Sequence, residues 1–314
     1  MNKPNSMDVT NAFLKHNVYY KDGLYGSPIQ GSLEPVCTFY KEYNTLLPFY
    51  SVVMPIYNQQ NVILKNLDAL IRYTGGTYEL ILILDCCSDM TPVIVQAWID
   101  SLQVPSNLYR IVVIVSRTPL FETSCDNIGF RLACGMFFLE IQADMEMTEQ
   151  DYNLVLTKPF IRYPNVIGVS GRCSHDFKET LGVGRLGHLI SQDFDASAYS
   201  NSKFYVNETC NRGPLLLDAH KVLSLGYLDE HNFYLDNSDH DLFARAFAKF
   251  GLICGYVPIN FKSPLEDGST RKPRDELNTQ FLKLRKARSN GGFLQEYKQK
   301  NLQSRPTYVL SLSI

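Results

Sequence analysis

The amino-acid sequence predicts an α/β fold with a mostly parallel sheet flanked by helices. Short apolar runs alternate with helical patterns in the first half of the chain, and these runs are apolar on both faces, as in parallel strands covered by helices. The chain has 314 residues, which suits one large domain with extensions. Ligands of such sheets bind beyond the carboxyl ends of the strands, so the residues after each run are candidates for a site.

Strands and helices alternate regularly up to residue 142. The β-branched run that stops at Pro55 predicts a buried strand, and the apolar residues after it have helical spacing up to a glycine pair. In order, the pattern predicts a strand at 50–55, a helix at 61–73, a strand at 79–84, a helix at 93–102, a strand at 109–116, a helix at 125–138 and a strand at 138–142.

The rest of the chain is less regular. In order, it predicts a strand at 165–171, loops and short elements at 177–205, a helix at 215–225, a helix at 241–250 and a strand at 252–259. We therefore expect a leader at 1–48 that packs on the domain, a domain at 49–264 and a polar C-terminal extension at 265–314. Within the domain, we expect a nucleotide half at 49–146 and an acceptor half at 147–264.

Composition excludes several classes of protein. The formal net charge is -2, so no broad basic field favours a nucleic-acid partner. No stretch approaches about 18 apolar residues, so we expect neither a signal peptide nor a transmembrane helix. The eight cysteines form no CxxC pair, which favours reduced thiols. We therefore expect a cytoplasmic protein, with any membrane attachment peripheral; the sequence does not predict the oligomeric state.

Two carboxylates follow the predicted strand at 138–142. Asp144 and Glu146 are one residue apart, so their side chains point the same way in an extended chain. Such a pair can hold a divalent cation through oxygen ligands, with a diphosphate completing the shell. A solvated acidic loop is the alternative.

Further acids occur at the predicted helix start near residue 240. Asp239 and Asp241 flank His240, and a carboxylate there is favoured by the helix N-terminus. One of them can act as a general base in a partly desolvated cleft. A helix cap is the alternative reading.

Asp85 ends the predicted strand at 79–84. An aspartate at this position can accept hydrogen bonds from a base or a ribose, or it can cap the following loop. Other patterns are weaker. The G-x-G-x-x-G string at 182–187 does not follow a buried strand, so it predicts no dinucleotide loop, and residues 55–61 lack the Gly-rich basic loop of a sugar nucleotidyltransferase. The six histidines show no paired spacing for zinc.

The order of these motifs resembles family 2 of the inverting glycosyltransferases, whose fold is of the GT-A type. The resemblance covers roughly residues 49–262 and rests on an opening strand, a turn after the second strand, an N-x-G helix, a D-x-E motif and a final acidic helix start. In order, these are residues 52–70, 80–89, 125–135, 141–148 and 224–251.

The resemblance implies a nucleotide pocket. Pro55, Tyr57 and Asn58 would line it, Asp85 would contact the base or ribose, and Asn127 lies on the N-x-G helix that borders it. UDP is the commonest nucleotide in the resembling family, so a UDP-sugar is the expected donor. The acceptor, which can be a glycan, a lipid, a protein or a small molecule, is not predicted.

The resemblance also implies the groups that carry the chemistry. Asp144 and Glu146 would hold Mn²⁺ or Mg²⁺ on the donor diphosphate, Lys262 could contact phosphate, and Asp239 stands in the place of the catalytic base. The implied reaction is a single displacement with inversion, in which the metal stabilises the departing diphosphate.

The sequence departs from the family pattern at several positions. Ser238 replaces the glutamate before the catalytic aspartate, Asp126 stands where an arginine is common, and Phe261, Lys262 and Ser263 occupy the place of a frequent histidine. The turn after Asp85 reads D-C-C-S. These departures motivate an alternative, a catalytically degenerate GT-A domain that serves as a binding or scaffold module.

Overall fold

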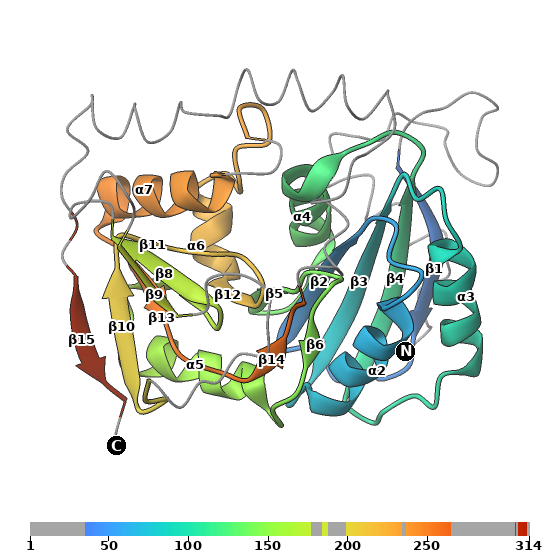
Figure 1. Cartoon of the computed structure of the whole chain (residues 1–314), viewed down its shortest axis with the longest axis horizontal. Coiled ribbons are helices and arrows are strands. Elements are labelled where there is room, and N and C mark those ends of the chain that lie inside the picture. Colours follow the sequence, from blue (N-terminus) through green and yellow to red (C-terminus); the bar gives the residue numbers. More distant parts are fainter. Residues whose placement is uncertain are drawn as a thin grey trace.

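The computed structural model describes residues 35–176, 184–187, 199–233, 237–264, 305 and 307–312. Four strands form the parallel unit that the sequence predicts (Figure 1). β2 (Tyr50–Ile56) lies between β3 (Tyr78–Asp85) and β5 (Phe137–Glu140), and β4 (Leu108–Ser116) lies beside β3, all in parallel. Every residue of β3 is buried, because helices cover both faces of the sheet.

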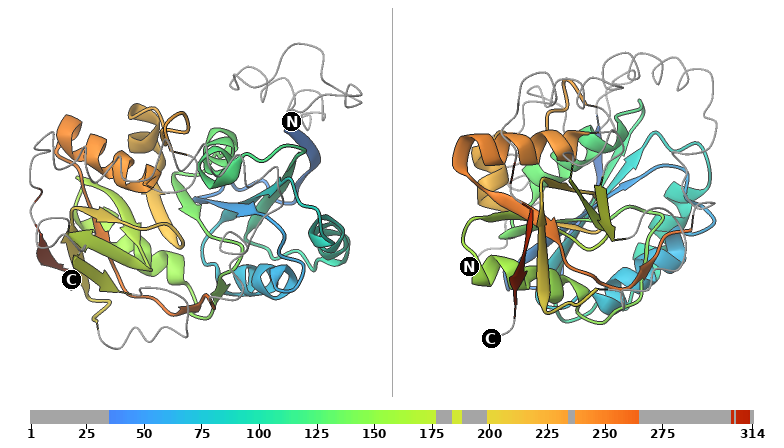
Figure 2. Two further views of the ribbon diagram at one scale, coloured as in Figure 1. Left: turned by 45° about the horizontal axis from the view of Figure 1, so that its top comes forward. Right: turned by 60° about the vertical axis from the view of Figure 1, so that its left-hand side comes forward.

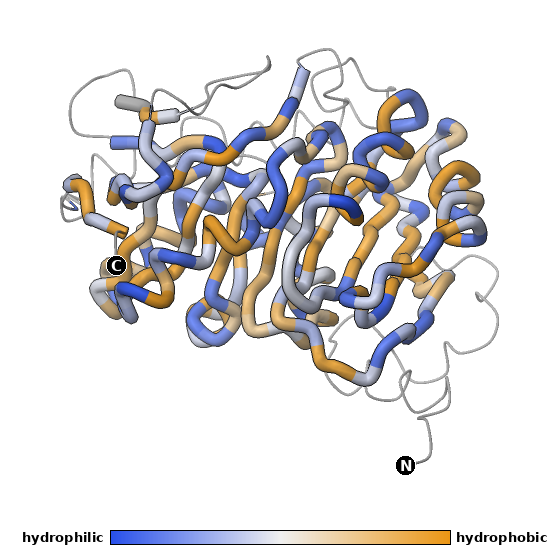
Figure 3. Tube along the Cα trace, turned by 90° about the horizontal axis from the view of Figure 1, so that it is seen from below, coloured by the Kyte–Doolittle hydropathy of each residue, from blue (hydrophilic) through white to orange (hydrophobic). Residues whose placement is uncertain are grey.

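Helices form a layer on each side of this sheet (Figure 1). Alternate residues of β2 enter different clusters: Val52 and Met54 pack on the α2 side, and Val53 packs on the α4 side. One layer contains α2 (Ile63–Tyr73), α3 (Thr91–Ser101) and α5 (Tyr152–Arg162), and the other contains α4 (Phe121–Leu132), α6 (Ala219–Ser224) and α7 (Ser238–Phe250). Hydrophobic segments run along the strands between these layers (Figure 3).

Beyond β5 the sheet becomes mixed. β12 (Leu215–Asp218) is antiparallel to both β5 and β7 (Val166–Ser170), and β13 (Ile253–Tyr256) is parallel to β7. β10 (Lys203–Asn207) then pairs antiparallel with β13 and with β15 (Tyr308–Ser311), which forms one edge (Figure 2). β1 (Val36–Glu42) pairs antiparallel with β4 and forms the other edge.

The edge strands come from the segments predicted as leader and C-terminal extension. Residues 1–34 and 265–304 of those segments lie outside the described residues. Two small sheets complete the fold: β6 (Glu146–Met147) with β14 (Phe261–Lys262), and β11 (Thr209–Cys210) with β8 (Cys173–Asp176) and β9 (Gly184–Gly187). Within the described chain, no helix is both long enough and apolar enough to cross a membrane.

Two predicted helices were placed wrongly. The helix expected at 125–138 begins at Phe121 and ends at Leu132, because the next amides bond elsewhere: Cys134 N–H donates to Glu79 Oε1 at 2.6 Å and Gly135 N–H to Ser51 Oγ at 2.8 Å. A Cβ at residue 135 would lie 2.7 Å from Ser51 Oγ, so only glycine allows this close approach.

The segment expected as a helix at 215–225 begins as strand β12. Its four residues pair with strands on both sides, and the helix α6 starts only at Ala219. The Asp218 carboxylate caps that helix by accepting the Lys221 N–H at 3.0 Å. The G-x-G-x-x-G string is also not a phosphate loop: its last four residues form β9, and residues 182–183 lie outside the described chain.

Candidate active site

The loops after β2 and β3 are joined at the carboxyl edge of the parallel unit. Asn58 Oδ1 accepts the Ser88 N–H at 2.8 Å, and Asn58 Nδ2 donates to Ser88 Oγ at 3.1 Å. Pro55 and Tyr57 are partly exposed beside them. Three residues of the predicted nucleotide pocket, Pro55, Tyr57 and Asn58, therefore lie at the edge where ligands of parallel sheets bind, and Asn58 joins this loop to the loop after β3.

Asp85 is buried and forms hydrogen bonds with the backbone at the start of α4. Its carboxylate accepts the N–H of Leu120 at 2.6 Å and that of Phe121 at 3.0 Å, where Phe121 has a left-handed φ of 64°. Asp85 thus ties the end of β3 to the start of α4, and not to the loop that follows it, which was the alternative in the sequence analysis. Its contact with a base or ribose stays a prediction.

Asn127 is fully buried in α4. Its Nδ2 donates to Leu228 O at 2.9 Å, and its Oδ1 accepts the Leu228 N–H at 3.1 Å. Both ends of the amide are therefore used to hold the loop after α6 against α4. Asn127 consequently has no place in the nucleotide pocket proposed below.

The acidic loop after β5 is fixed to α2. Asn66 Nδ2 donates to Ala143 O at 2.8 Å, beside Asp144, which is 9% exposed. Glu146 is partly exposed on β6, where Lys65 Nζ lies 3.8 Å from its Oε2 and Lys262 of β14 is its partner in register. The predicted metal ligand Glu146 therefore lies between two lysines.

Asp144 and Glu146 offer the hard oxygen donors that Mn²⁺ and Mg²⁺ prefer. Among the described residues, no three His, Cys, Asp or Glu side chains form a group that could hold an ion. Two carboxylates fit a cation whose other ligands come from a diphosphate and water, and they do not fit a cage made by the protein alone.

Asp239 lies in the first turn of α7 and is 7% exposed. Its Oδ1 accepts the His240 N–H at 2.8 Å. Burial raises the pKa of Asp239, but the charges of His240 and Arg212 outweigh burial and hold that pKa below its ordinary value of 3.8. Asp239 is therefore an ionised carboxylate in a nearly dry position, where it can accept a proton.

Asp241 and Arg245, in the first turns of α7, anchor this helix. Arg245 Nε donates to Asp241 Oδ2 at 2.7 Å, and its other nitrogens donate to the carbonyls of Leu225 and Tyr227 at 2.8 Å each. Asp241 therefore holds Arg245 in place, which fixes α7 to the loop after α6.

Two histidines adjoin Asp239. His240 Nδ1 lies 2.8 Å from Thr209 Oγ1 and 3.7 Å from Asp239 Oδ1. The ring of His175 meets that of His240 edge to face at 5.3 Å, and its Nε2 hydrogen-bonds to Asn211. The predicted base is thus bordered by polar groups from β8, β11 and the loop after it.

A buried charge cluster lies behind Asp239, and the sequence reasoning missed it. Arg212 NH1 is 3.1 Å from Glu122 Oε2 and 3.1 Å from Asp126 Oδ2. Glu140, the last residue of β5, is 1% exposed. A glutamate inside an apolar run was the available signal, because a buried carboxylate requires polar partners.

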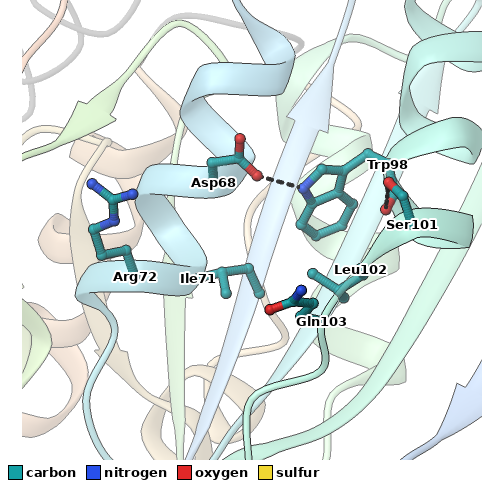
Figure 4. Close-up of a pocket in the computed structure, with 7 residues that line it drawn as sticks. All are labelled: Asp68, Ile71, Arg72, Trp98, Ser101, Leu102 and Gln103. Carbon is teal, nitrogen blue, oxygen red and sulfur yellow. Dashed lines mark hydrogen bonds between the residues drawn. The ribbon is translucent and has the colours of Figure 1, made fainter.

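A separate pocket of about 270 Å³ lies between α2 and α3 (Figure 4). Trp98 lines it and donates its indole N–H to Asp68 at 2.9 Å. Its residues, which include Arg72 and Gln103, belong to none of the groups described above, so the pocket is not part of the candidate site.

Comparison of sequences identifies relatives of the chain. Residues 51–212 match the family described as Glycosyl transferase family 2. The chain is also 23% identical over 157 residues to glycosyltransferase GlyA of Streptococcus pneumoniae, a match that covers 50% of this chain and 21% of that protein. The chain therefore spans about a fifth of the length of this relative.

Comparison with solved structures tests the fold. GalNAc-T7 with UDP, GalNAc and Mn²⁺ has a TM-score of 0.54 at 14% identity, covering 84% of this chain and 52% of that one. The S. aureus protein TarS with UDP-GlcNAc has a TM-score of 0.47 at 16% identity, covering 73% and 60%. The predicted α/β fold of the GT-A type is confirmed. The segment that matches the family, residues 51–212, spans more than half of this chain, and the chain therefore belongs to glycosyl transferase family 2.

Proposed function

We propose that the chain transfers a sugar from a nucleoside-diphosphate sugar to a hydroxyl group of an acceptor, with inversion at the anomeric carbon. The observation that carries this proposal is the state of Asp239, a nearly buried carboxylate whose pKa lies below its ordinary value at the start of α7. Membership of glycosyl transferase family 2 supports the donor class. We propose UDP as the nucleotide to test first, because the structure of GalNAc-T7, which shares the fold, contains UDP.

In this reaction Asp239 accepts the proton of the acceptor hydroxyl as that oxygen forms a bond to the anomeric carbon. The bond from that carbon to the diphosphate breaks on the opposite face, and its electron pair leaves with the nucleoside diphosphate. Attack from the opposite face inverts the configuration. A carboxylate that stays ionised down to low pH is available for this task throughout the neutral range.

The donor would lie along the carboxyl edge of the parallel unit. Pro55, Tyr57 and Asn58 would contact the nucleoside, and the exposed Lys65 and Lys262 would contact the phosphates. Asp144 and Glu146 would hold Mn²⁺ or Mg²⁺, which offsets the negative charge of a leaving diphosphate when it is bound. A cation would also replace Lys65 as the partner of Glu146, which frees that lysine for phosphate.

A calorimetric titration of UDP, GDP and dTDP, each with and without Mn²⁺, tests the proposal. We expect one nucleotide to bind, and to bind more tightly with Mn²⁺. Release of that nucleotide from the matching sugar donors, with NMR of the product to assign the anomer, then tests turnover and inversion. If no nucleotide binds under either condition, the chain is a non-catalytic binding module; a retained anomeric configuration would exclude Asp239 as the base of a single displacement.

A further inference from the structure

Arg212 lies at the centre of the buried charge cluster, and only 5% of it is exposed. Burial by itself would lower its pKa, but the carboxylates of Glu122, Asp126, Asp239 and Glu140 raise it, so the guanidinium remains charged. Four acidic side chains therefore surround one cation. If all four were ionised, the cluster would carry excess negative charge, which would lower the stability of the fold because buried charges normally require matched partners.

Two of these acids hold their protons more strongly than free carboxyls do. Burial raises the pKa of Asp126 well above its ordinary value despite the opposing charge of Arg212. Burial and the neighbouring Asp126 do the same for the pKa of Glu140. Burial therefore weakens the competition of Asp126 and Glu140 with Glu122 and Asp239 for the charge of Arg212.

A chain of hydrogen bonds runs from Arg212 to the start of α7. Arg212 NH2 donates to Thr123 Oγ1 at 2.9 Å, and the Thr123 hydroxyl donates to Ser238 Oγ at 3.0 Å. Ser238 is fully buried and precedes Asp239. The guanidinium thus acts on Asp239 in two ways, through its charge and through the position of the helix start.

The same cluster reaches the acidic loop after β5. The second oxygen of Glu122, Oε1, accepts Gln142 Nε2 at 2.6 Å, and Arg172 NH1 donates to Gln142 Oε1 at 2.9 Å. Gln142 lies two residues before Asp144. Glu122 and Thr123, adjacent on α4, therefore connect Arg212 to the diphosphate side and to the base side of the proposed site.

We infer that Arg212 is a positioning residue for sugar transfer: it holds α4 against the start of α7 and so sets the position of Asp239. This inference rests on the proposed function. His240 lowers the pKa of Asp239 only while it is protonated, whereas a guanidinium is charged at every working pH. Lysine could not replace Arg212, because a point charge cannot contact Glu122, Asp126 and Thr123 together in the way that a planar fork does.

Three variants separate charge from position. For Arg212→Lys, which keeps the charge, we expect kcat to fall at least about 10-fold while KM for the donor changes by less than about 2-fold, because only the alignment of the base is disturbed. For Arg212→Met, which removes the charge, we also expect the acid limb of the kcat–pH profile to move up by about one pH unit. For Thr123→Val, we expect a lower kcat with the acid limb unmoved.

Arg110→Lys is the matched control. Arg110 is a buried arginine paired with Glu79 at 2.5 Å, between β3 and β4 and outside the proposed site. We expect it to keep kcat within about 2-fold even where its thermal midpoint falls. If Arg212→Met does not fold, Arg212→Lys and Thr123→Val carry the test.

The outcomes are distinct. An active parent whose Arg212→Lys and Thr123→Val variants both keep kcat within about 2-fold would overturn the positioning role alone. An acid limb that does not move in a folded Arg212→Met variant would show that Arg212 does not act on Asp239 through its charge. A parent that binds no nucleotide and releases none from any donor would overturn the proposed function, and this inference with it.

Discussion

The two halves of the domain, residues 49–146 and 147–264, bury polar groups in different ways. In the first half, Glu79 and Arg110 form a matched pair: Glu79 accepts hydrogen bonds from Ser51 and Cys134, and Arg110 donates to the Leu132 carbonyl. Where the halves meet, Arg212 is surrounded by an excess of acids. The matched pair is what stability alone requires. The cluster around Arg212 contains more acids than cations, and buried ionisable groups with shifted pKa values concentrate at functional sites, which is why we place this cluster beside the proposed site.

The largest expected effect concerns Asp239, the proposed base beside the cluster around Arg212. We expect Asp239→Asn to reduce transfer by about 10² to 10⁴-fold, because the amide cannot accept the proton of the acceptor hydroxyl. Nucleotide affinity should stay near that of the parent in a calorimetric titration. Asp229→Asn changes a partly exposed carboxylate that accepts N–H groups within its own loop; this variant is the control and should retain activity. Substantial transfer by Asp239→Asn would mean that another group is the base.

The next effect tests the stability side. Glu79→Gln leaves the buried Arg110 charge without its partner, so we expect the free energy of unfolding to fall by about 3 kcal/mol. Urea denaturation followed by circular dichroism measures this loss. Glu42→Gln, an exposed glutamate that accepts the Tyr109 hydroxyl at 3.0 Å, is the matched control with little expected change. Equal stability of the two variants would show that the Glu79–Arg110 pair is not the matched structural pair described above.

A third prediction concerns the boundary between the halves at the acidic loop. Asp144→Asn removes one of two carboxylates available to a cation, so we expect nucleotide affinity in Mn²⁺ to fall by at least about 10-fold. Affinity measured without metal should hardly change, because the neutral amide alters no contact to the nucleoside. The exposed Asp100, which pairs with Gln96 on α3, gives the control variant Asp100→Asn. Equal losses with and without Mn²⁺ would argue that Asp144 supports the loop and holds no metal.

The two halves also differ in how far the sequence predicts them. In the first half, β2, β3 and β4 are each followed by a helix, so local periodicity placed these strands within about two residues. In the second half, β12 inserts antiparallel between β5 and β7, a pairing that depends on residues far apart in sequence. Its four apolar residues alone cannot distinguish a strand from the start of a helix.

The candidate site shows the same limit. Motif order selected Asp144, Glu146 and Asp239, and the structure adds which of them have charged neighbours. Asn127 was assigned to the nucleotide pocket because it lies in a motif, yet both ends of its side-chain amide form hydrogen bonds with the backbone of Leu228. Arg212 was not selected, because its role arises only when α4 and the start of α7 come together.

The smallest expected effect tests whether the excess acids are protonated. Burial first, and then Asp126, raises the pKa of Glu140 above its ordinary value of 4.5. The folded protein therefore keeps a proton that the unfolded chain releases above that pH, so the contribution of Glu140 to stability falls as pH rises toward its raised pKa. This loss cannot exceed about 1.4 kcal/mol per pH unit.

Glu140→Gln isolates that contribution. The variant has no proton to lose, and its carbonyl can still accept the Gly213 N–H that Glu140 accepts at 2.6 Å. We therefore expect the variant to match the parent near pH 5 and to become relatively more stable as pH rises, in urea denaturation across that range. Glu79→Gln, which breaks the matched pair, should be less stable than the parent at every pH. If Glu140→Gln is also less stable than the parent at every pH, Glu140 is ionised in the folded protein. The cluster around Arg212 would then contain one more negative charge than the raised pKa of Glu140 implies.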